Sequence, residues 1–420
     1  MTHRVPAASP DGLYRSGAAP LPEPACTRLQ RIDRLASHGR LLLLQGPNGP
    51  FFRRLALRLR DLGATVTKVN LNAGDDLFHP RADAVCFEKR ADEWPGFLEG
   101  LLCARRIAAV VLFGQDRPLH RVAAQLAQRL GIAVVVFEEG YVRPCWITME
   151  LDGVNGRSAL MRPLEPAPAV HVQPAQPQQF RFAFAAMAAF SVAYLLWGCI
   201  FRCRYPHYVH HKPLTLREAI PWLRCYRRKA GYVLVQRSLL RRLCGPSAPP
   251  FFLVSLQMAV DSQIIHHSPW RSNEDFIRAV LASFAAHAGS EELLVFKHHP
   301  LEIGHAHYGA VIAREAELLG VARRVHYVHG GHLPSLLQRA RGVVLVNSTV
   351  GLQAMHHGTP VCATGDAIYA KPGLTHQEPL DAFWNRPQNP DPAAFRSFLD
   401  RVLDTSQVNS SFYAPGAWWR

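Results

Sequence analysis

Two neighbouring acidic residues stand where their chemistry has a use. Within "VVVFEEGYVRP", residues 134–144, Glu138 and Glu139 follow a run of apolar β-forming residues and precede a glycine. Their like charges repel and burial would cost both carboxylates their solvation, so the pair does not serve the strand itself. Ligands of open α/β sheets bind at the carboxyl ends of strands. The pair therefore predicts a site of acid chemistry.

A basic group ends another apolar run further along the chain. The segment "FKHHP", residues 296–300, contains Lys297, His298 and His299. Successive side chains of a strand point to opposite faces, so we expect only one of the two histidines to reach a ligand. The alternative is that both are polar residues of a surface turn.

The segment "VVLVNSTVG", residues 343–351, ends a third apolar run with Asn347, Ser348 and Thr349 and then begins a helical pattern. Ser348 or Thr349 could simply cap the helix. The same position offers hydroxyl and backbone N–H groups to a phosphate, and a helix N-terminus favours negative charge. We favour the phosphate interpretation.

The first apolar run, near residue 44, leads into "QGPNGPFFRR". This segment lacks the G-K-[ST] ending of a phosphate loop and is not G-x-G-x-x-G, so a nucleotide fingerprint is unsupported. Gly46 and Gly49 let the backbone approach a substrate closely or simply make the turn. Polar residues also end the neighbouring runs, namely Lys68, Asn70, Asn72 and Asp75 in one, and Asp116, Arg117 and His120 in the other, where Asp116 could also be a helix cap.

Composition limits the class of protein. With 420 residues, 48% hydrophobic and 19% charged, the chain has room for two folded domains. Its nine cysteines are scattered without C-x-x-C, which indicates reduced thiols in a cytoplasmic protein rather than a zinc site or disulfides. Pro, Asp and Arg interrupt the first twenty residues, so we do not expect a secretory signal.

The elements that position these residues alternate between strand and helix. Apolar runs of four to seven residues alternate with helical patterns from residue 40 to about 140 and again from about 250, which predicts two parallel α/β lobes. Many nucleotide-sugar glycosyltransferases have two such lobes, although dehydrogenases and periplasmic binding proteins do as well. The predicted divisions are an N-terminal arm (1–30), an N-terminal lobe (31–163), a linker with apolar and basic helical segments (164–247), a C-terminal lobe (248–378) and a helical tail (379–420).

The middle of the chain is apolar and then basic. Residues 182–201 carry no charge, and we favour a buried or interface helix there over a membrane-surface helix or a membrane span. From Arg202 to Arg242 there are eleven Lys or Arg against one acid, Glu218, within a chain of formal charge +15. Such a balance suits nucleic acid, an anionic membrane or a phosphate-bearing substrate.

Several motifs in order resemble a known family. "LLLLQGPNGPFFRRLALRL", "KVNLNAGDD", "VVLFGQDRPLHR", "FEEGYVRP", "SLQMAVDSQI", "FKHHPLE" and "VNSTVGLQAMHHGTPV" are similar to the KpsS type of the capsule-synthesis family of Gram-negative bacteria. The similarity runs from about residue 40 to about 378. The family in turn resembles bacterial sialyltransferases in an acidic pair with glycine, a His-Pro and a Ser/Thr helix start.

The resemblance implies a GT-B-like α/β fold of two Rossmann-like lobes facing a central cleft. It implies transfer of the acidic sugar Kdo in β linkage from CMP-Kdo to lysophosphatidylglycerol, which starts the linker of a capsular polysaccharide. Glu139 matches the catalytic acid, although that position is usually aspartate, and it is either a nucleophile, which we favour because donor and product share the β configuration, or a general base. Glu138 would orient it.

The resemblance assigns the remaining residues to substrate binding. His299 would hold the CMP phosphate with Ser348 and Thr349, and the predicted donor site comprises His299, Lys297, Ser348, Thr349, Gln257 and Glu302. The predicted acceptor site comprises Gly46, Asn48, Asn70, Asn72, Asp116, Arg117, His120 and Arg143. No D-x-D triplet is present where a metal-dependent enzyme would need one, so we expect neither a metal nor another cofactor.

A lipid acceptor gives the basic segment a role, because Lys and Arg attract an anionic bilayer. We therefore expect a cytoplasmic protein bound peripherally to the inner membrane, with other capsule assembly and export proteins as partners and without nucleic acid, since no nucleic-acid module accompanies the charge. The alternative function is a non-enzymatic scaffold for capsule binding or export. A kinase or other NTP user is disfavoured by the missing phosphate loop.

Overall fold

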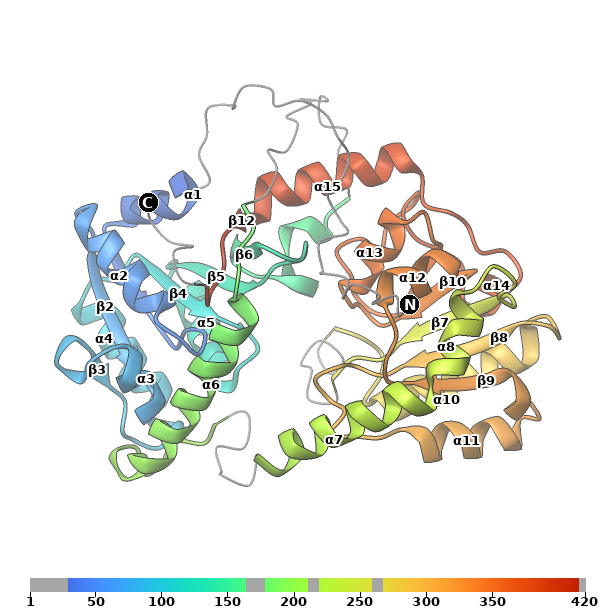
Figure 1. The fold of residues 1–420 in the computed structure, drawn as a ribbon. Helices are drawn as coiled ribbons and strands as arrows, with labels where there is room; N and C mark the ends of the chain where they lie inside the picture. The colour runs from blue at the N-terminus through green and yellow to red at the C-terminus, as the bar shows by residue number, and fades with distance from the viewer. Residues whose placement is uncertain (1–28, 164–177, 211–218, 259–266, 415–420) are drawn as a thin grey trace, which may run out of the picture.

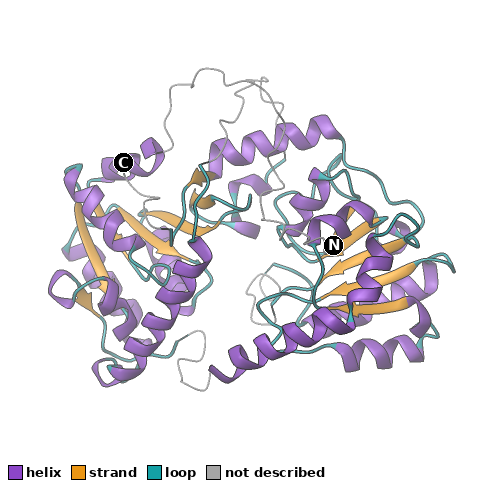
Figure 2. Cartoon of the chain, in the orientation of Figure 1, coloured by secondary structure: helices purple, strands orange, loops and turns teal. Residues whose placement is uncertain are grey.

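The computed structural model describes residues 29–163, 178–210, 219–258 and 267–414 (Figure 1). Residues 1–28 of the predicted arm, residues 164–177 of the predicted linker, and Lys212, Arg217 and Glu218 of the basic segment lie outside these residues. Two separate sheets with helices on their faces form two lobes (Figure 2). The GT-B-like architecture of two α/β lobes is thus confirmed.

The N-terminal lobe is built on a seven-stranded sheet of order β12-β6-β5-β4-β1-β2-β3. Its strands are β1 (Arg40–Leu43), β2 (Thr65–Asn70), β3 (Val85–Cys86), β4 (Ala109–Phe113), β5 (Ala133–Glu139), β6 (Trp146–Leu151) and β12 (Gln407–Asn409). The first five are parallel, as predicted, whereas β6 runs antiparallel to β5, and β12 pairs antiparallel with β6. The parallel sheet predicted for this lobe is thus extended at one edge by β6 and β12.

Helices cover both faces of this sheet. They are α1 (Leu29–Asp33), α2 (Phe51–Asp61), α3 (Ala73–Phe78), α4 (Trp94–Ala104) and α5 (Pro118–Arg129). One core lies between the sheet and α2 and contains Phe51 and Phe137, and another lies beneath α4 and α5 and contains Trp94 and Val110. Because apolar side chains of the central strands are buried on both faces, these strands appear in the sequence as continuous apolar runs.

The C-terminal lobe has a fully parallel five-stranded sheet of order β11-β10-β7-β8-β9. The strands are β7 (Phe251–Ser255), β8 (Leu293–Lys297), β9 (Val325–Val328), β10 (Gly342–Leu345) and β11 (Val361–Ala363). The helices are α10 (Asn273–His287), α11 (Gly309–Leu318), α12 (Leu333–Arg339) and α13 (Val350–His356). These helices confirm that helical patterns alternate with the strands from about residue 250, as predicted.

The middle segment divides between the lobes. Helix α6 (Ala183–Ile200) packs on α3 of the N-terminal lobe, while α7 (Ala219–Val235) and α8 (Arg237–Cys244) run along the C-terminal lobe (Figure 1). Only 11% of α6 is buried, although Tyr194 and Gly198 lie fully inside. The predicted helix is therefore an interface helix on one face and is exposed on the other.

The C-terminal tail returns to the first lobe. After α14 (Leu380–Phe383), the helix α15 (Pro392–Ser406) passes back between the lobes, and β12 pairs with β6. Phe412 then packs against Phe51 and Phe113 in the N-terminal core. The tail was predicted to be helical. It does contain α14 and α15, but its end also adds a strand to the sheet that carries the acidic pair.

Short 3-10 helices complete the chain. They are η1 (Arg34–His38), η2 (Arg81–Asp83), η3 (Ala91–Glu93), η4 (Asn155–Arg157), η5 (Ala159–Met161), η6 (Arg202–Arg204) and η8 (Ala322–Arg324).

Candidate active site

The acidic pair forms the last two residues of β5. Glu138 and Glu139 pair with Thr148 and Ile147 of β6, and the backbone N–H of Glu139 donates to Glu138 Oε1 at 3.2 Å. Gly140 follows, and a Cβ there would collide with the backbone carbonyl of Trp146. The glycine of the acidic motif is therefore required by the tight approach of β6 to the end of β5.

The surroundings of the two carboxylates differ. Burial and the charge of Glu139 raise the pKa of Glu138 to about 7, against the backbone hydrogen bond from Glu139 and the charges of Arg117 and Arg143. Burial also raises the pKa of Glu139, against the positive charge of Arg143 and a hydrogen bond from Tyr413 that favour the ionised form. The pKa of both carboxyl groups is therefore raised, and the charge of Arg143 favours the ionised form of each.

Arg117 connects the pair to a buried polar network. Its Nη1 donates to Gln45 Oε1 at 2.8 Å, and Gln45 Nε2 donates to the hydroxyl of Tyr194 at 2.9 Å. Tyr194 OH in turn donates to Asp75 Oδ1 at 3.0 Å. The guanidinium beside Glu138 is held by Gln45 in the loop after β1, which is held in turn by residues of α3 and α6.

In the C-terminal lobe, β8 ends at Lys297, and the two histidines that follow have different environments. His298 is buried, with Nδ1 2.6 Å from the hydroxyl of Tyr327. His299 is partly exposed and accepts the N–H of Leu301 at Nδ1, 3.3 Å away, so its neutral ring carries a hydrogen on Nε2. The prediction that only one histidine is available to a ligand agrees with this arrangement, and that histidine is His299.

Electrostatic effects also lower the basicity of this group. Burial, together with the charges of Arg143 and Lys297, lowers the pKa of His299 to about 4. Burial lowers the pKa of Lys297 to about 8. At neutral pH, His299 is therefore a neutral hydrogen-bond donor, while Lys297 remains mostly charged.

Ser348 and Thr349 lie partly exposed between β10 and α13. Thr349 occupies the N-cap position but its side chain does not cap the helix, and Ser348 Oγ accepts the N–H of Val350 at 3.3 Å. Gln257 is buried and holds Asn347 from both sides, donating to Oδ1 at 3.0 Å and accepting the backbone N–H at 3.1 Å. Gln257 therefore supports the loop that presents the two hydroxyl residues.

Glu302, also predicted for the donor site, is 3% exposed and accepts a hydrogen bond of 3.3 Å from the hydroxyl of Tyr308. This carboxylate therefore has a hydrogen-bond partner within the C-terminal lobe.

The two groups face each other across the lobes. Arg143 lies near enough to act electrostatically on both glutamates and on His299. His267 Nε2 lies 3.6 Å from Asp116 Oδ2 of the N-terminal lobe, and its carbonyl accepts Asn347 Nδ2 at 3.2 Å. The carboxyl ends of β4 and β10 are thereby linked, as a site between lobes requires.

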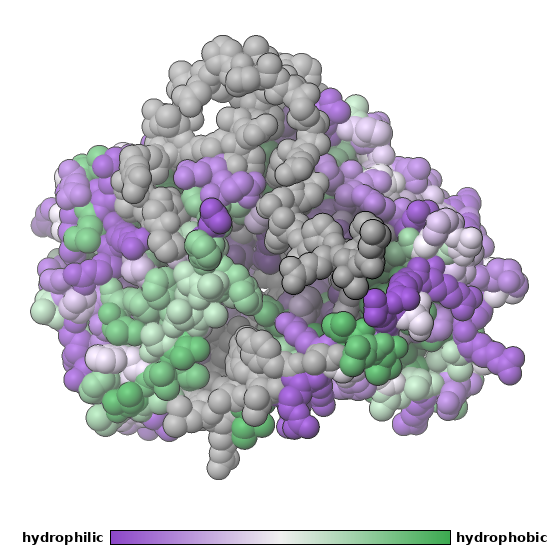
Figure 3. Space-filling model, in the orientation of Figure 1, coloured by the Kyte–Doolittle hydropathy of each residue, from purple (hydrophilic) through white to green (hydrophobic). Residues whose placement is uncertain are grey.

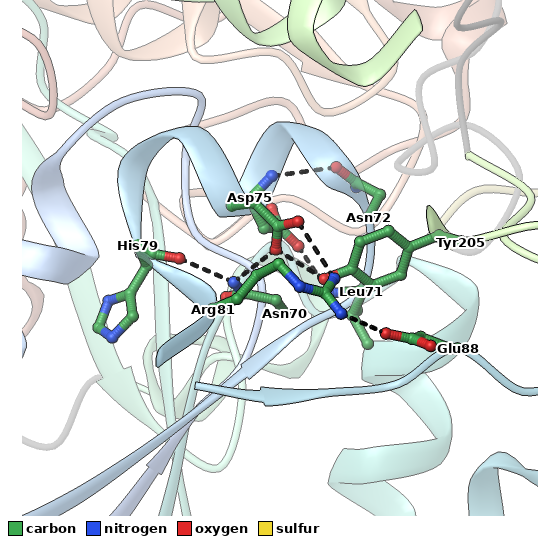
Figure 4. Close-up of polar contacts among 9 residues, drawn as sticks. Asn70, Leu71, Asn72, Asp75, His79, Arg81, Glu88 and Tyr205 are labelled. Carbon is green, nitrogen blue, oxygen red and sulfur yellow. Dashed lines mark hydrogen bonds and ion pairs between the residues drawn. The ribbon is translucent and has the colours of Figure 1, made fainter. Parts of the chain in front are cut away.

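The predicted acceptor residues fall into two groups. Arg117 and Arg143 lie at the acidic pair, and Gly46 and Asn48 lie in the loop after β1, partly exposed. Asn70 is fully buried and donates to Asp76 and the His79 carbonyl (Figure 4).

The remaining acceptor residues also have partners within the lobe. Asn72 caps α3 by accepting the N–H of Asp75 (Figure 4). His120 is buried with Nδ1 3.0 Å from the carbonyl of Gly114, and burial lowers its pKa to about 3. Asp116 pairs with Arg157 at 3.3 Å and with His267. These three residues are therefore held by partners within the protein.

Three functional candidates were missed from the sequence. Tyr413 reaches Glu139 only because β12 joins the sheet, and His267 reaches Asp116 only because the lobes meet. Gln45 is the one with a local signal, since it directly follows the first apolar run. Among the residues described, no cluster of three or more His, Cys, Asp or Glu side chains could hold a metal ion.

Two α/β lobes that face each other, with a carboxylate pair at a strand end of one and Lys297, His299, Ser348 and Thr349 at strand ends of the other, define a GT-B-like protein. The chain belongs to the capsule polysaccharide biosynthesis protein family, which matches residues 108–413.

Relatives extend this match to most of the chain. The capsule polysaccharide export protein KpsS of Escherichia coli is 37% identical over 90% of this chain and 98% of its own length. The capsule polysaccharide modification protein LipB of Neisseria meningitidis is 38% identical over 90% of this chain and 93% of its own. Among solved structures, the β-Kdo 2,4 transferase of Thermosulfurimonas dismutans KpsC is similar over 85% of this chain and 89% of its own, at 14% identity and a TM-score of 0.40.

Proposed function

We propose that the protein is a β-Kdo glycosyltransferase that transfers Kdo from CMP-Kdo to lysophosphatidylglycerol and so starts the linker of a capsular polysaccharide. The observation that carries this proposal is that one arginine, Arg143, acts on both the acidic pair and His299. A sugar between the lobes would thus have a carboxylate on one side and phosphate-binding groups on the other. Membership of a capsule biosynthesis family supports a step in capsule synthesis.

The C-terminal lobe would bind CMP-Kdo and stabilise the leaving CMP. Neutral His299 donates through Nε2, Lys297 supplies positive charge, and Ser348 and Thr349 offer hydroxyl groups to the phosphate. Donors aimed at a leaving phosphate stabilise the charge that develops in the transition state. This arrangement needs no metal, so we expect transfer to persist with a chelator present.

Glu139 would act as the nucleophile. Its carboxylate attacks the anomeric carbon as the bond to the CMP phosphate breaks, and the acceptor hydroxyl then displaces the carboxylate and loses its proton. Two displacements retain the β configuration of the donor. Glu138 accepts the backbone N–H of Glu139 and so fixes the end of β5.

Glu139→Gln tests the proposal, because it keeps the size of the side chain but removes the nucleophile. Purified protein is incubated with CMP-Kdo, generated in place, and a fluorescent lysophosphatidylglycerol, and the product is weighed by mass spectrometry. Wild type and the control Glu99→Gln, an exposed glutamate on α4, should add one Kdo. Glu139→Gln should reduce transfer by at least about 1,000-fold while CMP affinity, measured by calorimetry, changes less than about twofold.

The second candidate is a non-enzymatic scaffold for capsule binding or export, which the name of the Escherichia coli relative, a capsule polysaccharide export protein, favours. It predicts tight binding of finished Kdo chains and no added sugar with wild type. For either function we place the protein in the cytoplasm, peripherally on the inner membrane, with other capsule assembly and export proteins as partners.

A further inference from the structure

Helix α6 is apolar on every face, yet protein covers only one of them. Residues 183–200 contain no charged side chain. Large apolar side chains on the outer face are strongly exposed, at 66% for Phe184, 56% for Val192, 44% for Leu196 and 67% for Ile200. These positions are spaced by four or eight residues and so share one stripe of the helix. A helix that is hydrophobic all round normally has an apolar environment on all sides.

A second exposed apolar area lies where α7 meets α8. Val233, Leu234 and Val235 are 63%, 75% and 79% exposed. Figure 3 shows hydrophobic surface over α6 and again where Figure 1 places the junction of α7 and α8, on the same face of the molecule. One broad external partner could therefore contact both areas at once.

The charge around these areas has a single sign. Exposed basic side chains flank the apolar residues, namely Arg181, Arg202, Arg204, Arg224, Arg227, Lys229, Arg237, Arg241 and Arg242. Glu218 is the only acidic residue between positions 181 and 244. Apolar side chains bordered by arginines fit the boundary between acyl chains and anionic headgroups of a bilayer. A second copy of the chain, related by a two-fold axis, would instead bring like charges together.

We propose that the outer face of α6, together with the α7–α8 junction, is a docking surface for an anionic phospholipid bilayer, with α6 lying in the plane of the interface.

The inner face of the same helix leads to the acidic pair. Tyr194 OH accepts from Asn72 Nδ2 at 2.6 Å and from Gln45 Nε2 at 2.9 Å, and Gln45 accepts from Arg117 beside Glu138. The helix that forms the docking surface is thus connected by hydrogen bonds to the lobe that carries the acidic pair. On the proposed function, on which this step rests, α6 presents a lipid acceptor to that lobe directly from the bilayer.

Vesicle sedimentation tests the docking surface without any substrate. Wild type should sediment with vesicles of phosphatidylglycerol and phosphatidylethanolamine and much less with phosphatidylcholine alone. The combined variant Phe184→Ser, Leu196→Ser, Ile200→Ser should bind at least about tenfold more weakly. Leu318→Ser on α11, which removes an equally exposed apolar side chain (70%), should bind as wild type does.

A second variant, Arg202→Gln with Arg204→Gln, should lose binding to the anionic vesicles in particular. Equal melting temperatures of all variants show that they are folded. Wild-type binding by the α6 variant, or a wild-type dimer that this variant converts to monomer with vesicle binding unchanged, would overturn the proposal, the second result in favour of a second copy as the partner.

Transfer to vesicle-embedded and to detergent-solubilised acceptor separates this inference from the proposed function. We expect the α6 variant to lose transfer only with the vesicle-embedded acceptor. Vesicle binding without transfer to either acceptor would reject the proposed function and leave the docking surface standing. Equal transfer by wild type and the α6 variant with both acceptors would reject the presentation of the acceptor by α6.

Discussion

At the scale of single residues, the acidic pair is held in a state that an unconstrained chain would avoid. Burial raises the pKa of both Glu138 and Glu139, while Arg143 favours the ionised form of each and the hydroxyl of Tyr413 favours that of Glu139. Perturbed groups of this kind concentrate at functional sites, where stability is lower than the fold alone would allow. The pair should therefore reduce stability in a pH-dependent way.

Glu138→Gln should stabilise the protein at pH 8 and have little effect at pH 4.5. The pKa of Glu138 is raised to about 7 from an ordinary 4.5, so between these values the folded protein holds a proton that the unfolded chain has released. Folding stability consequently falls as the pH rises through this window and stays lower above it. An amide never ionises, so the variant should gain on the order of 1–3 kcal/mol at pH 8.

The measurement is a series of melting temperatures from pH 4.5 to 8 for wild type, Glu138→Gln and the control Glu99→Gln. The first variant should diverge upward from wild type with rising pH, and the control should run parallel to wild type. A constant difference between Glu138→Gln and wild type would mean that Glu138 does not titrate within this window.

At the scale of elements, the contact between α3 and α6 depends on one glycine. A Cβ on Gly74 would lie 2.7 Å from the ring of Tyr194, which stacks with Phe78 of the same short helix α3. Gly74→Ala should force the two helices apart and destabilise the protein by about 1–3 kcal/mol. Proteolysis of α6 should become faster in this variant.

Gly96→Ala on α4 is the matched control, because no atom lies within 4 Å of the added Cβ. There the helix should gain roughly 0.5–1 kcal/mol. If Gly74→Ala left the melting temperature and the proteolysis of α6 unchanged, the packing described for Tyr194 would be wrong.

The elements also show how far the sequence could predict the molecule. Alternating apolar runs and helical patterns predicted the parallel core of both lobes, and the polar residues Glu139 and His299 lie at strand ends, as predicted. The antiparallel strand β6 was not predicted, although it follows the acidic pair in the chain. Its apolar pattern is interrupted by Glu150, which lies inside the lobe and accepts a hydrogen bond from Tyr141. Strand β12 has only three residues, and its pairing spans more than half of the chain, so no local signal marks it.

Buried polar residues show why residue type and position alone do not identify a ligand-binding residue. Asn70, Asn72 and His120 stand at strand ends as ligand-binding residues do, yet the structure uses them to fix the turns and α3. Residue type and position are the same in both roles. Only the partners distinguish them, and those partners come from distant parts of the chain.

At the scale of the whole molecule, the two lobes are joined by shared packing. Tyr141, Trp146 and Leu160 of the N-terminal lobe belong to the same apolar core as Leu345 and Tyr369 of the C-terminal lobe. The helix α15 and the strand β12 add a covalent return path between them. Unfolding either lobe would expose the apolar surface of the other, so we expect one calorimetric transition for the described lobes together.

Lys371 links the two lobes by hydrogen bonds at this junction. It therefore provides the most direct test of that coupling. Its Nζ donates to the carbonyls of Met161 at 3.2 Å and Arg162 at 2.8 Å, where the N-terminal lobe ends. Lys371→Met keeps the length of the side chain but leaves both carbonyls without this donor, at a cost of about 1–3 kcal/mol. The single transition should move down by a few degrees without splitting, whereas Lys89→Met, at an exposed ion pair with Glu93, should leave it in place. Two separate transitions in wild type, or a Lys371→Met variant in which only one lobe melts earlier, would show that the lobes unfold independently and that Arg143 and His299 are not held in a fixed relation.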